Sequence, residues 1–330
     1  LGNVKLGVQL DDASRLTIVA NGVDLTAQDP LGLTRSQFES NPRTAAIQAR
    51  TFNTRKTVQQ TQGGLVYERD IDANHSLRVM LYYGQRSTVQ YQAIPVAAQQ
   101  PPGSAGGMID LARSYGGADL RWTSRLSVAD RPLTLIVGLS YDSMVEQRKG
   151  YENYTGSPDM PTLGERGNLR RNETNRVYNL DPYLQMSLQA SPQWTVDAGL
   201  RYSTVSFDSS DHYIVPGNPD DSGGLRYRKA LPIAALRYTP ARNTMLYASY
   251  GRGLETPTLN ELSYRPNAQP GMNFGLNPAL SDNFELGAKK EVAGGLLTVA
   301  IFRSDTQDEI VPATSLGGRT SYRNAGRTRR

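Results

Sequence analysis

Short turns and long polar connections alternate along this chain, and the segments between them alternate apolar and polar residues. The short turns fall at Asp11–Ser14, Asp70–Ser76, Ala129–Pro132, Ala190–Gln193, Thr239–Asn243 and Ala293–Gly295. Antiparallel strands that cross an outer membrane need this arrangement, because every backbone N–H and C=O in hydrocarbon must pair with a neighbouring strand. The pattern therefore predicts an all-β fold, a transmembrane antiparallel β-barrel.

The alternating segments predict about 13 strands. They are, in chain order, Val4–Gln9, Arg15–Asn21, Thr57–Arg69, Leu77–Tyr91, Met108–Trp122, Leu133–Gln147, Arg176–Leu188, Trp194–Phe207, Leu225–Tyr238, Met245–Gly253, Asn283–Lys290, Leu296–Ile310 and Thr320–Arg330. Tilted segments of about 9–11 residues span a bilayer, and several of these are longer. A water-soluble β-sandwich shows the same alternation, but the strand lengths and the unequal connections favour the barrel.

The alternation also assigns residues to faces of the sheet. Leu81 and Leu200 are predicted to face lipid, and Arg78 and Arg201 are predicted to face the lumen. Two prolines, at positions 182 and 232, fall inside predicted strands. Because proline cannot donate to a strand ladder, we expect a β-bulge or a rim position at each.

Composition excludes a membrane-spanning helix. Hydrophobic residues make up 38% of the chain, the mean hydropathy is −0.50, and no apolar run approaches the ~18 residues that a spanning helix needs. The absence of Cys removes disulfides and thiolate metal sites, and the net charge of +5 contains no basic block typical of nucleic-acid binding. No signal peptide precedes the first strand, so we expect one partial barrel domain over residues 1–330 of a longer protein.

The long connections are expected to carry the function, because loops beyond about 12–15 residues are usually functional or disordered. They cover approximately residues 24–55, 92–107, 148–173, 209–224, 254–282 and 311–319, all on one rim. Arginine forks pair with carboxylates and aromatic rings stack on flat ligands, so these loops predict a site for a planar anion. The predicted ligand-binding residues are Arg148, Tyr151, His212, Tyr213, Arg252 and Arg265. Anionic lipopolysaccharide is an alternative partner for each of them.

The chain offers little for enzyme chemistry. Its two histidines, His75 and His212, fall at opposite predicted rims, so we predict no catalytic residues, no metal site and no cofactor. Ser209, Asp211 and His212 could be drawn as a hydrolase triad, but neighbouring residues seldom align as a relay, and no G-x-S-x-G motif is present. The protein is therefore predicted not to be an enzyme.

Two motifs lie in the last third of the chain: Gly251-Arg252-Gly253-Leu254-Glu255-Thr256-Pro257 and Asn324-Ala325-Gly326-Arg327-Thr328-Arg329-Arg330. They resemble general motifs of TonB-dependent outer-membrane receptors, and the resemblance extends over essentially the whole chain. Other loop strings resemble the branch of this family that imports pyrroloquinoline quinone; they are Asp29–Thr34, Gln90–Pro95, Arg148–Tyr151, Asp208–His212 and Gly271–Leu276.

The resemblance implies a monomeric barrel of about 22 strands in the bacterial outer membrane, of which this chain would supply about 13. It also implies an N-terminal plug and a TonB-contacting segment, the TonB box, both missing from this chain. The implied function is TonB-powered import of a small anionic cofactor, pyrroloquinoline quinone. Lipopolysaccharide would surround the barrel, and phages or bacteriocins could use its loops as a receptor.

Two alternatives stay open. The arginine and aromatic content of the loops also fits a catecholate or citrate ferric siderophore, which would make the protein a siderophore receptor of the same superfamily. A passive porin is the alternative from a different class, and it would have an open lumen without a plug.

Overall fold

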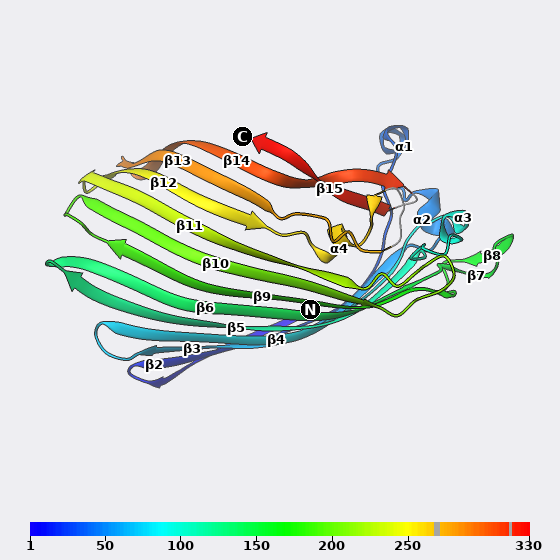
Figure 1. The fold of residues 1–330 in the computed structure, drawn as a ribbon, viewed down its shortest axis with the longest axis horizontal. Helices are drawn as coiled ribbons and strands as arrows, with labels where there is room; N and C mark the ends of the chain where they lie inside the picture. The colour runs from blue at the N-terminus through cyan, green and yellow to red at the C-terminus, as the bar shows by residue number, and fades with distance from the viewer. Residues whose placement is uncertain (267–270, 317–318) are drawn as a thin grey trace.

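The computed structural model describes residues 1–266, 271–316 and 319–330. Within them, 13 strands form one antiparallel sheet (Figure 1), ordered along the chain apart from a small separate hairpin, β7–β8. The sheet strands are β1 (Gly2–Asp11), β2 (Ser14–Gln28), β3 (Arg55–Asp70), β4 (His75–Tyr91), β5 (Met108–Val128), β6 (Arg131–Tyr151), β9 (Leu169–Leu188), β10 (Trp194–Asp211), β11 (Gly223–Ala241), β12 (Thr244–Glu255), β13 (Ala279–Val292), β14 (Gly295–Leu316) and β15 (Arg319–Arg329).

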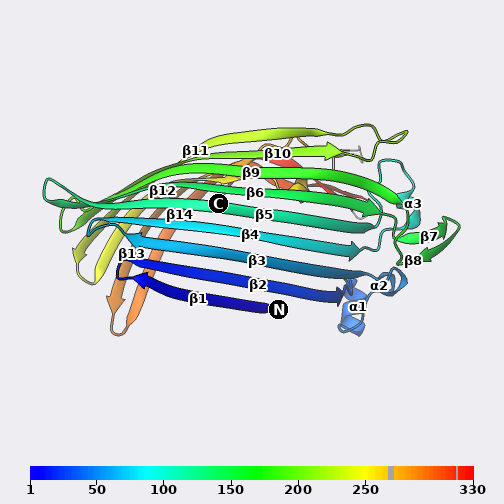
Figure 2. The same ribbon diagram turned by 90° about the horizontal axis from the view of Figure 1, so that it is seen from below.

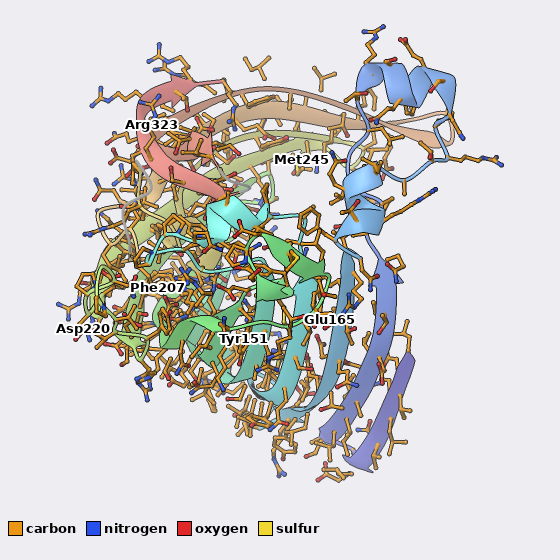
Figure 3. The ribbon with its side chains drawn as sticks, turned by 90° about the vertical axis from the view of Figure 1, so that its right-hand side faces the viewer. Tyr151, Glu165, Phe207, Asp220, Met245 and Arg323 are labelled. Carbon is orange, nitrogen blue, oxygen red and sulfur yellow. The ribbon has the colours of Figure 1, made fainter. Side chains whose placement is uncertain are left out.

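The remaining elements all lie at one end of the sheet, the end of the long connections (Figure 2). They are the hairpin strands β7 (Tyr154–Ser157) and β8 (Met160–Leu163) and the short helices α1 (Arg35–Ser40), α2 (Ile47–Thr51), α3 (Val96–Gln99) and α4 (Leu259–Leu262). Seen from this end, the strands form an open arc (Figure 3). None of the helices in the described residues has the length and apolar character needed to cross a bilayer.

Two of the short turns at the opposite end have backbones suited to tight hairpins. Ala129 and Asp130 both have positive φ, as do Ala293 and Gly294. Two consecutive positive-φ residues form the kind of turn whose twist matches that of antiparallel strands. The alternation of short turns and long connections predicted from the sequence is therefore confirmed.

All of the predicted strand segments are strands, but several continue further into the predicted loops. Strand β6 continues to Tyr151 and β9 begins at Leu169, inside the predicted connection 148–173. Strand β14 reaches Leu316, so most of the predicted connection 311–319 is also paired strand. The sequence analysis ended these strands too early because their last residues are polar. Hydrogen bonding to a neighbouring strand does not require apolar side chains, so the strands continue through them.

Cross-strand pairing defines two faces of the sheet; we call the face that contacts α4 the inner face and the opposite one the outer face. Leu81 and Leu200 lie on the outer face with 44% and 49% of their surface exposed. Arg78 and Arg201 lie on the inner face, next to the carboxylates of Asp119 and Asp181 respectively. The predicted faces are therefore confirmed.

The two prolines meet neither expectation, because no bulge is found at either and both lie within their strands instead of at a rim. Pro182 pairs with Leu139 in unbroken register, and on its other side the β9–β10 register is the same before and after it. Pro232 pairs with Leu200, and the β11–β12 ladder begins one residue further on, at Ile233. The ladder therefore omits pairs beside each proline instead of inserting a residue.

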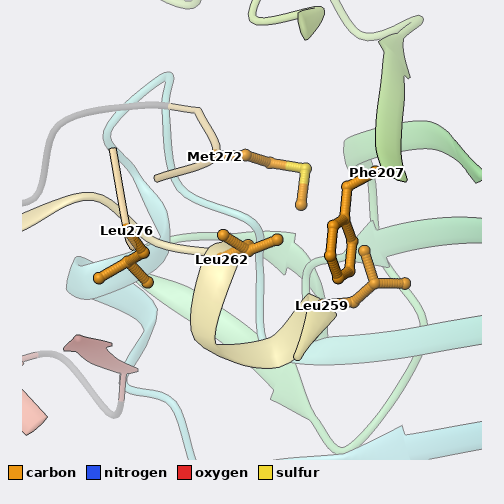
Figure 4. Packing of buried hydrophobic residues seen from close by; sticks show 5 residues of the cluster. All are labelled: Phe207, Leu259, Leu262, Met272 and Leu276. Atoms are coloured by element: carbon orange, nitrogen blue, oxygen red, sulfur yellow. The ribbon is translucent and has the colours of Figure 1, made fainter. Parts of the chain in front are cut away.

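A small hydrophobic core lies on the inner face near the long-connection end (Figure 4). It joins β10 to the connection between β12 and β13 and consists of Phe207, Leu259, Leu262, Met272 and Leu276. Helix α4 begins with a capping box, in which Thr258 and Glu261 satisfy each other's backbone N–H groups. This packing fixes where the residues after α4, Ser263 and Tyr264, meet the sheet.

Candidate functional site

Ser263, the residue that follows α4, is held to the inner face of the sheet by two arginines. Arg148 of β6 donates from Nη1 to Ser263 Oγ over 2.5 Å, and Arg171 of β9 donates from Nη1 to the Ser263 carbonyl over 3.3 Å. Both arginine side chains are buried, and Ser263 is only 2% exposed. These bonds place the next residue, Tyr264, between strands that are far from it in sequence.

Three guanidinium groups surround the Tyr264 ring. Their carbon atoms lie 6.0 Å (Arg148), 5.5 Å (Arg171) and 5.2 Å (Arg319) from the ring centroid. Such distances permit attraction between each cation and the aromatic face. We call Tyr264 and these three arginines the arginine cage.

Positive charge exceeds negative charge inside the arginine cage. Arg171 forms an ion pair with Glu173, while Arg148 and Arg319 form none among the described residues. Arg319 instead donates to Ser104 Oγ over 3.2 Å and to the Gly106 carbonyl over 2.9 Å. Neutral hydrogen-bond partners do not fully offset the free-energy cost of burying a charged guanidinium, and they do not cancel its charge. The cage is therefore a region of positive potential.

This potential acts on the phenol of Tyr264. Burial by itself disfavours the phenolate, but the three guanidinium groups of the cage outweigh it and lower the pKa of Tyr264 below its usual value. An anion is therefore favoured at this position, whether it is the phenolate itself or a group supplied by a ligand.

A small polar cavity of about 40 Å³ adjoins the cage. Arg170, Glu173, Tyr213 and Tyr264 are among its lining residues. Arg170 Nε and Glu173 Oε2 are buried without a hydrogen-bond partner among the described residues. The cavity has room for ordered water only, so a ligand of larger size must contact the exposed rim of the cage.

The structure brings three of the six predicted ligand-binding residues together. Arg148 belongs to the cage, Tyr213 lines the adjoining cavity, and Arg265 follows Tyr264 in the chain and is exposed. Burial and the neighbouring Asp211 raise the pKa of Asp221, which lines the cavity. The positive charge of Arg265 opposes this rise, so Arg265 lies close enough to act on the cavity electrostatically.

The other three predicted residues lie elsewhere. Arg166 stacks over the ring of the buried Tyr151 at 3.8 Å, and His212 Nε2 lies 3.0 Å from Thr174 Oγ1, a residue of the outer face. Arg252 lies on the outer face and binds both carboxylate oxygens of Asp282, over 2.9 and 3.1 Å. These residues do not form one site with the cage.

The six predicted ligand-binding residues do not include Arg171, Arg319 or Tyr264, although Arg171 and Tyr264 lie in long connections predicted to carry the function. The alternation of β9 could have indicated Arg171, because it shares the inner face with Glu173 and Asn175. No local sequence pattern could have paired Tyr264 with Arg319, because strand register and the inward path of the β12–β13 connection bring them together. Across the described residues, no group of three or more His, Asp or Glu side chains is arranged to hold a metal ion.

Comparison with known proteins identifies the family. Residues 5–330 match the family model described as "TonB dependent receptor-like, beta-barrel". The probable TonB-dependent siderophore receptor PiuA of Acinetobacter baumannii is 25% identical over an alignment of 169 residues that covers 48% of this chain and 20% of that protein.

Solved structures share the fold. The ferric yersiniabactin uptake receptor FyuA of Yersinia pestis has a TM-score of 0.72 at 18% identity, covering 98% of this chain and 46% of that one. The ferric-catecholate import receptor Fiu of Escherichia coli K12, in its closed form, has a TM-score of 0.70 at 14% identity, covering 99% and 53%. This chain thus spans 20% of the length of the curated relative and about half of these structures. The chain belongs to the TonB-dependent receptor β-barrel family, whose members are outer-membrane proteins of Gram-negative bacteria.

Proposed function

We propose that the protein containing this chain is an outer-membrane receptor that imports a small anionic ligand with energy from TonB, and that the ligand is a ferric siderophore. The family match over residues 5–330 supports the transport class, and the relatives named for siderophore uptake support this ligand class. The arginine cage is the single structural observation that supports an anionic ligand. TonB would act through a segment outside this chain.

In this proposal the cage attracts and orients the ligand, while more exposed groups contact it. Arg265 is exposed and Tyr213 is partly buried, so both can reach a ligand without displacing α4. The unpaired charges of Arg148 and Arg319 favour anions at the mouth of the barrel. Hydrogen bonds between an arginine fork and a carboxylate or catecholate oxygen then fix the ligand's orientation.

Pyrroloquinoline quinone is the second candidate ligand. The loop strings Gln90–Pro95 and Asp208–His212 motivate it, because they resemble the branch of the family that takes up this cofactor. It is also a flat tricarboxylate, which suits arginine forks and aromatic rings. The two candidates differ in whether uptake brings iron into the cell.

Growth separates the candidates. A strain that carries the complete gene is grown under iron limitation with a ferric catecholate, and an auxotrophic strain is grown with pyrroloquinoline quinone. Rescue by the siderophore that is lost on deletion of the gene supports the first candidate. Rescue by pyrroloquinoline quinone alone supports the second candidate. If deletion of the gene abolishes neither rescue, both candidates are contradicted.

Binding to the purified complete receptor tests the site. Arg265→Gln should weaken binding of the transported ligand about 10- to 100-fold, since a hydrogen bond to a charged group contributes about 1.5–3 kcal/mol. Arg252→Gln, on the outer face, is the matched control and should leave affinity unchanged. Unchanged affinity in both Arg265→Gln and Arg148→Gln, with heat-modifiable gel mobility intact, would reject this site.

A further inference from the structure

The β12–β13 connection is anchored at Ser263, the residue before Tyr264. Leu259 and Leu262 of α4 pack with Phe207 and fix the helix on the sheet (Figure 4). Ser263 is 2% exposed, and its hydroxyl also donates to the Leu259 carbonyl. Tyr264, by contrast, is only half-buried. Its side chain therefore extends into the arginine cage from a fixed point of the backbone.

The hydrogen bonds of the cage arginines go to groups other than the Tyr264 hydroxyl. Among the described residues, Arg148 donates one, Arg171 two and Arg319 two, and none of these bonds ends on that hydroxyl. A guanidinium carries five N–H groups, so each arginine keeps donors that these bonds do not use. Attraction between the cations and the aromatic face therefore holds the ring, with no directional bond to its oxygen.

The cage is shaped for one flat ring that carries an oxyanion. Its guanidinium carbons come from β6, β9 and β15 and lie between 5.2 and 6.0 Å from the centroid of the Tyr264 ring. A carboxylate without a ring would match the charge but would leave the space between the guanidinium groups unfilled. A ring-borne oxyanion matches both, and the lowered pKa of Tyr264 shows the same preference.

The cage has no room for a second ring beside Tyr264. The adjoining cavity measures about 40 Å³, whereas a cavity of about 150 Å³ holds one benzene molecule. A ring of the ligand can therefore enter only where the Tyr264 side chain has turned out. Rotation about the side-chain bonds of Tyr264 achieves this without moving Ser263 or α4. Tyr264 and a ligand ring are thus mutually exclusive occupants of the cage.

We propose that Tyr264 occupies a ligand subsite in the unliganded receptor, and that one catecholate ring of the ferric ligand replaces it in the arginine cage. This inference rests on the import function proposed above, and it narrows the ligand to siderophores whose iron-binding oxygens are carried on aromatic rings. Catecholate oxygens are anionic and accept the N–H groups that the Tyr264 hydroxyl leaves unused. Ferric citrate has no aromatic ring and does not use this subsite.

The first experiment asks whether the cage binds a free aromatic diol. Catechol is titrated into the purified complete receptor by calorimetry, with cyclohexane-1,2-diol as the non-aromatic probe. Only catechol should bind, and only to Tyr264→Ala, since the ring fills the cage in the unaltered receptor and in Tyr264→Phe. Adding Arg319→Gln to Tyr264→Ala should weaken binding about tenfold. Tyr91→Ala is the matched control, because it removes a ring that Arg55 covers at 3.6 Å on the outer face.

The second experiment distinguishes displacement of Tyr264 from contact with it. A ferric catecholate and ferric citrate are titrated into the same receptors. An internal competitor present in about nine-tenths of the molecules lowers the apparent affinity about tenfold. Tyr264→Ala should therefore bind the ferric catecholate about tenfold more tightly than the unaltered receptor does, with no change for ferric citrate. Tyr264→Phe and Tyr91→Ala should bind both ligands like the unaltered receptor.

Heat-modifiable gel mobility checks that every variant is folded. Weaker binding of the ferric catecholate by Tyr264→Ala would mean that Tyr264 stays in place and contacts the ligand, which would overturn the inference. No binding of catechol to Tyr264→Ala, or equal binding of the non-aromatic diol, would also overturn it. Catechol binding involves no transport, so its presence together with failed growth rescue would count against the import proposal and leave the subsite supported.

Discussion

The arginine cage and the exposed arginines on the outer face of β12 and β14, Arg252 and Arg303, use the same residue type on opposite faces of one sheet. In the cage, Arg148 and Arg171 are 5% and 8% exposed, and a loop residue, Tyr264, fills the space between them. On the outer face, Arg252 and Arg303 are open to solvent. Arg252 pairs with Asp282 directly opposite on β13, and Arg303 pairs with Asp305 two residues along β14. Burial, more than residue type, therefore decides what removing an arginine costs.

The difference arises from the connection between β12 and β13. That connection turns inward, packs α4 against Phe207 and covers the inner ends of β6 and β9. No comparable segment among the described residues covers the outer face of β12–β14, where Arg252 and Arg303 pair with aspartates of the sheet. Four predictions test this comparison, from the largest expected effect to the smallest.

The largest effect is expected for Arg171→Leu, because it leaves the Glu173 carboxylate buried and unpaired. Breaking one side of a buried ion pair costs about 3–5 kcal/mol. The free energy of unfolding, measured by urea titration in lipid vesicles with tryptophan fluorescence, should fall by this amount. Adding Glu173→Leu should recover more than half of the loss; no recovery would mean that Arg171 acts through Tyr264 instead.

Leu200→Arg places a charge on the lipid-facing surface and should cost about 2–4 kcal/mol if the residue lies near the bilayer midplane. Ser249→Arg is the control, because Ser249 lies on the inner face directly opposite Glu285. Its cost should be well under half that of Leu200→Arg in the same unfolding assay. Similar costs at both positions would contradict the assignment of faces.

Arg252→Leu should cost less than about 1 kcal/mol, since its ion pair with Asp282 is exposed to water. The same assay in high salt should show a smaller difference, because salt screens exposed pairs. A cost comparable to that of Arg171→Leu would erase the distinction between the exposed arginines of the outer face and the cage.

The smallest effect concerns the ionisation of Tyr264. Its pKa is lowered in the folded protein, so between that pKa and the unfolded value near 10 the folded state binds fewer protons than the unfolded state. The free energy of unfolding, compared with that of Tyr264→Phe, should therefore rise as the pH increases toward 10. The contribution from Tyr264 ionisation should vanish at lower pH. Absorbance titration at alkaline pH should show one early-ionising tyrosine that Tyr264→Phe removes; a titration unchanged by this variant would contradict the cage's positive potential.

The sequence alone determined the architecture and the faces of the wall. Every strand of the 13-stranded sheet could be located, because a sheet with one face in lipid imposes a period of two on its side chains. The small hairpin β7–β8 was not located and lies inside a predicted long connection. Short turn segments such as Ala129–Pro132 supplied the boundaries. Strand ends were less predictable, since hydrogen-bonded pairing continues through polar residues such as those of β14.

Only the tertiary structure decided which arginines meet. Arg148, Tyr264 and Arg319 come from a strand end, a loop and another strand end, and no local pattern links them. Their contact depends on cross-strand register and on the inward path of the β12–β13 connection. Arg252 illustrates the same limit from the other side: its place in a long-loop motif suggested the ligand site, but its register in β12 puts its guanidinium on the outer face. Alternation along one strand determines which face of the sheet each side chain occupies. Packing over the whole sheet determines which strands and loops come close together.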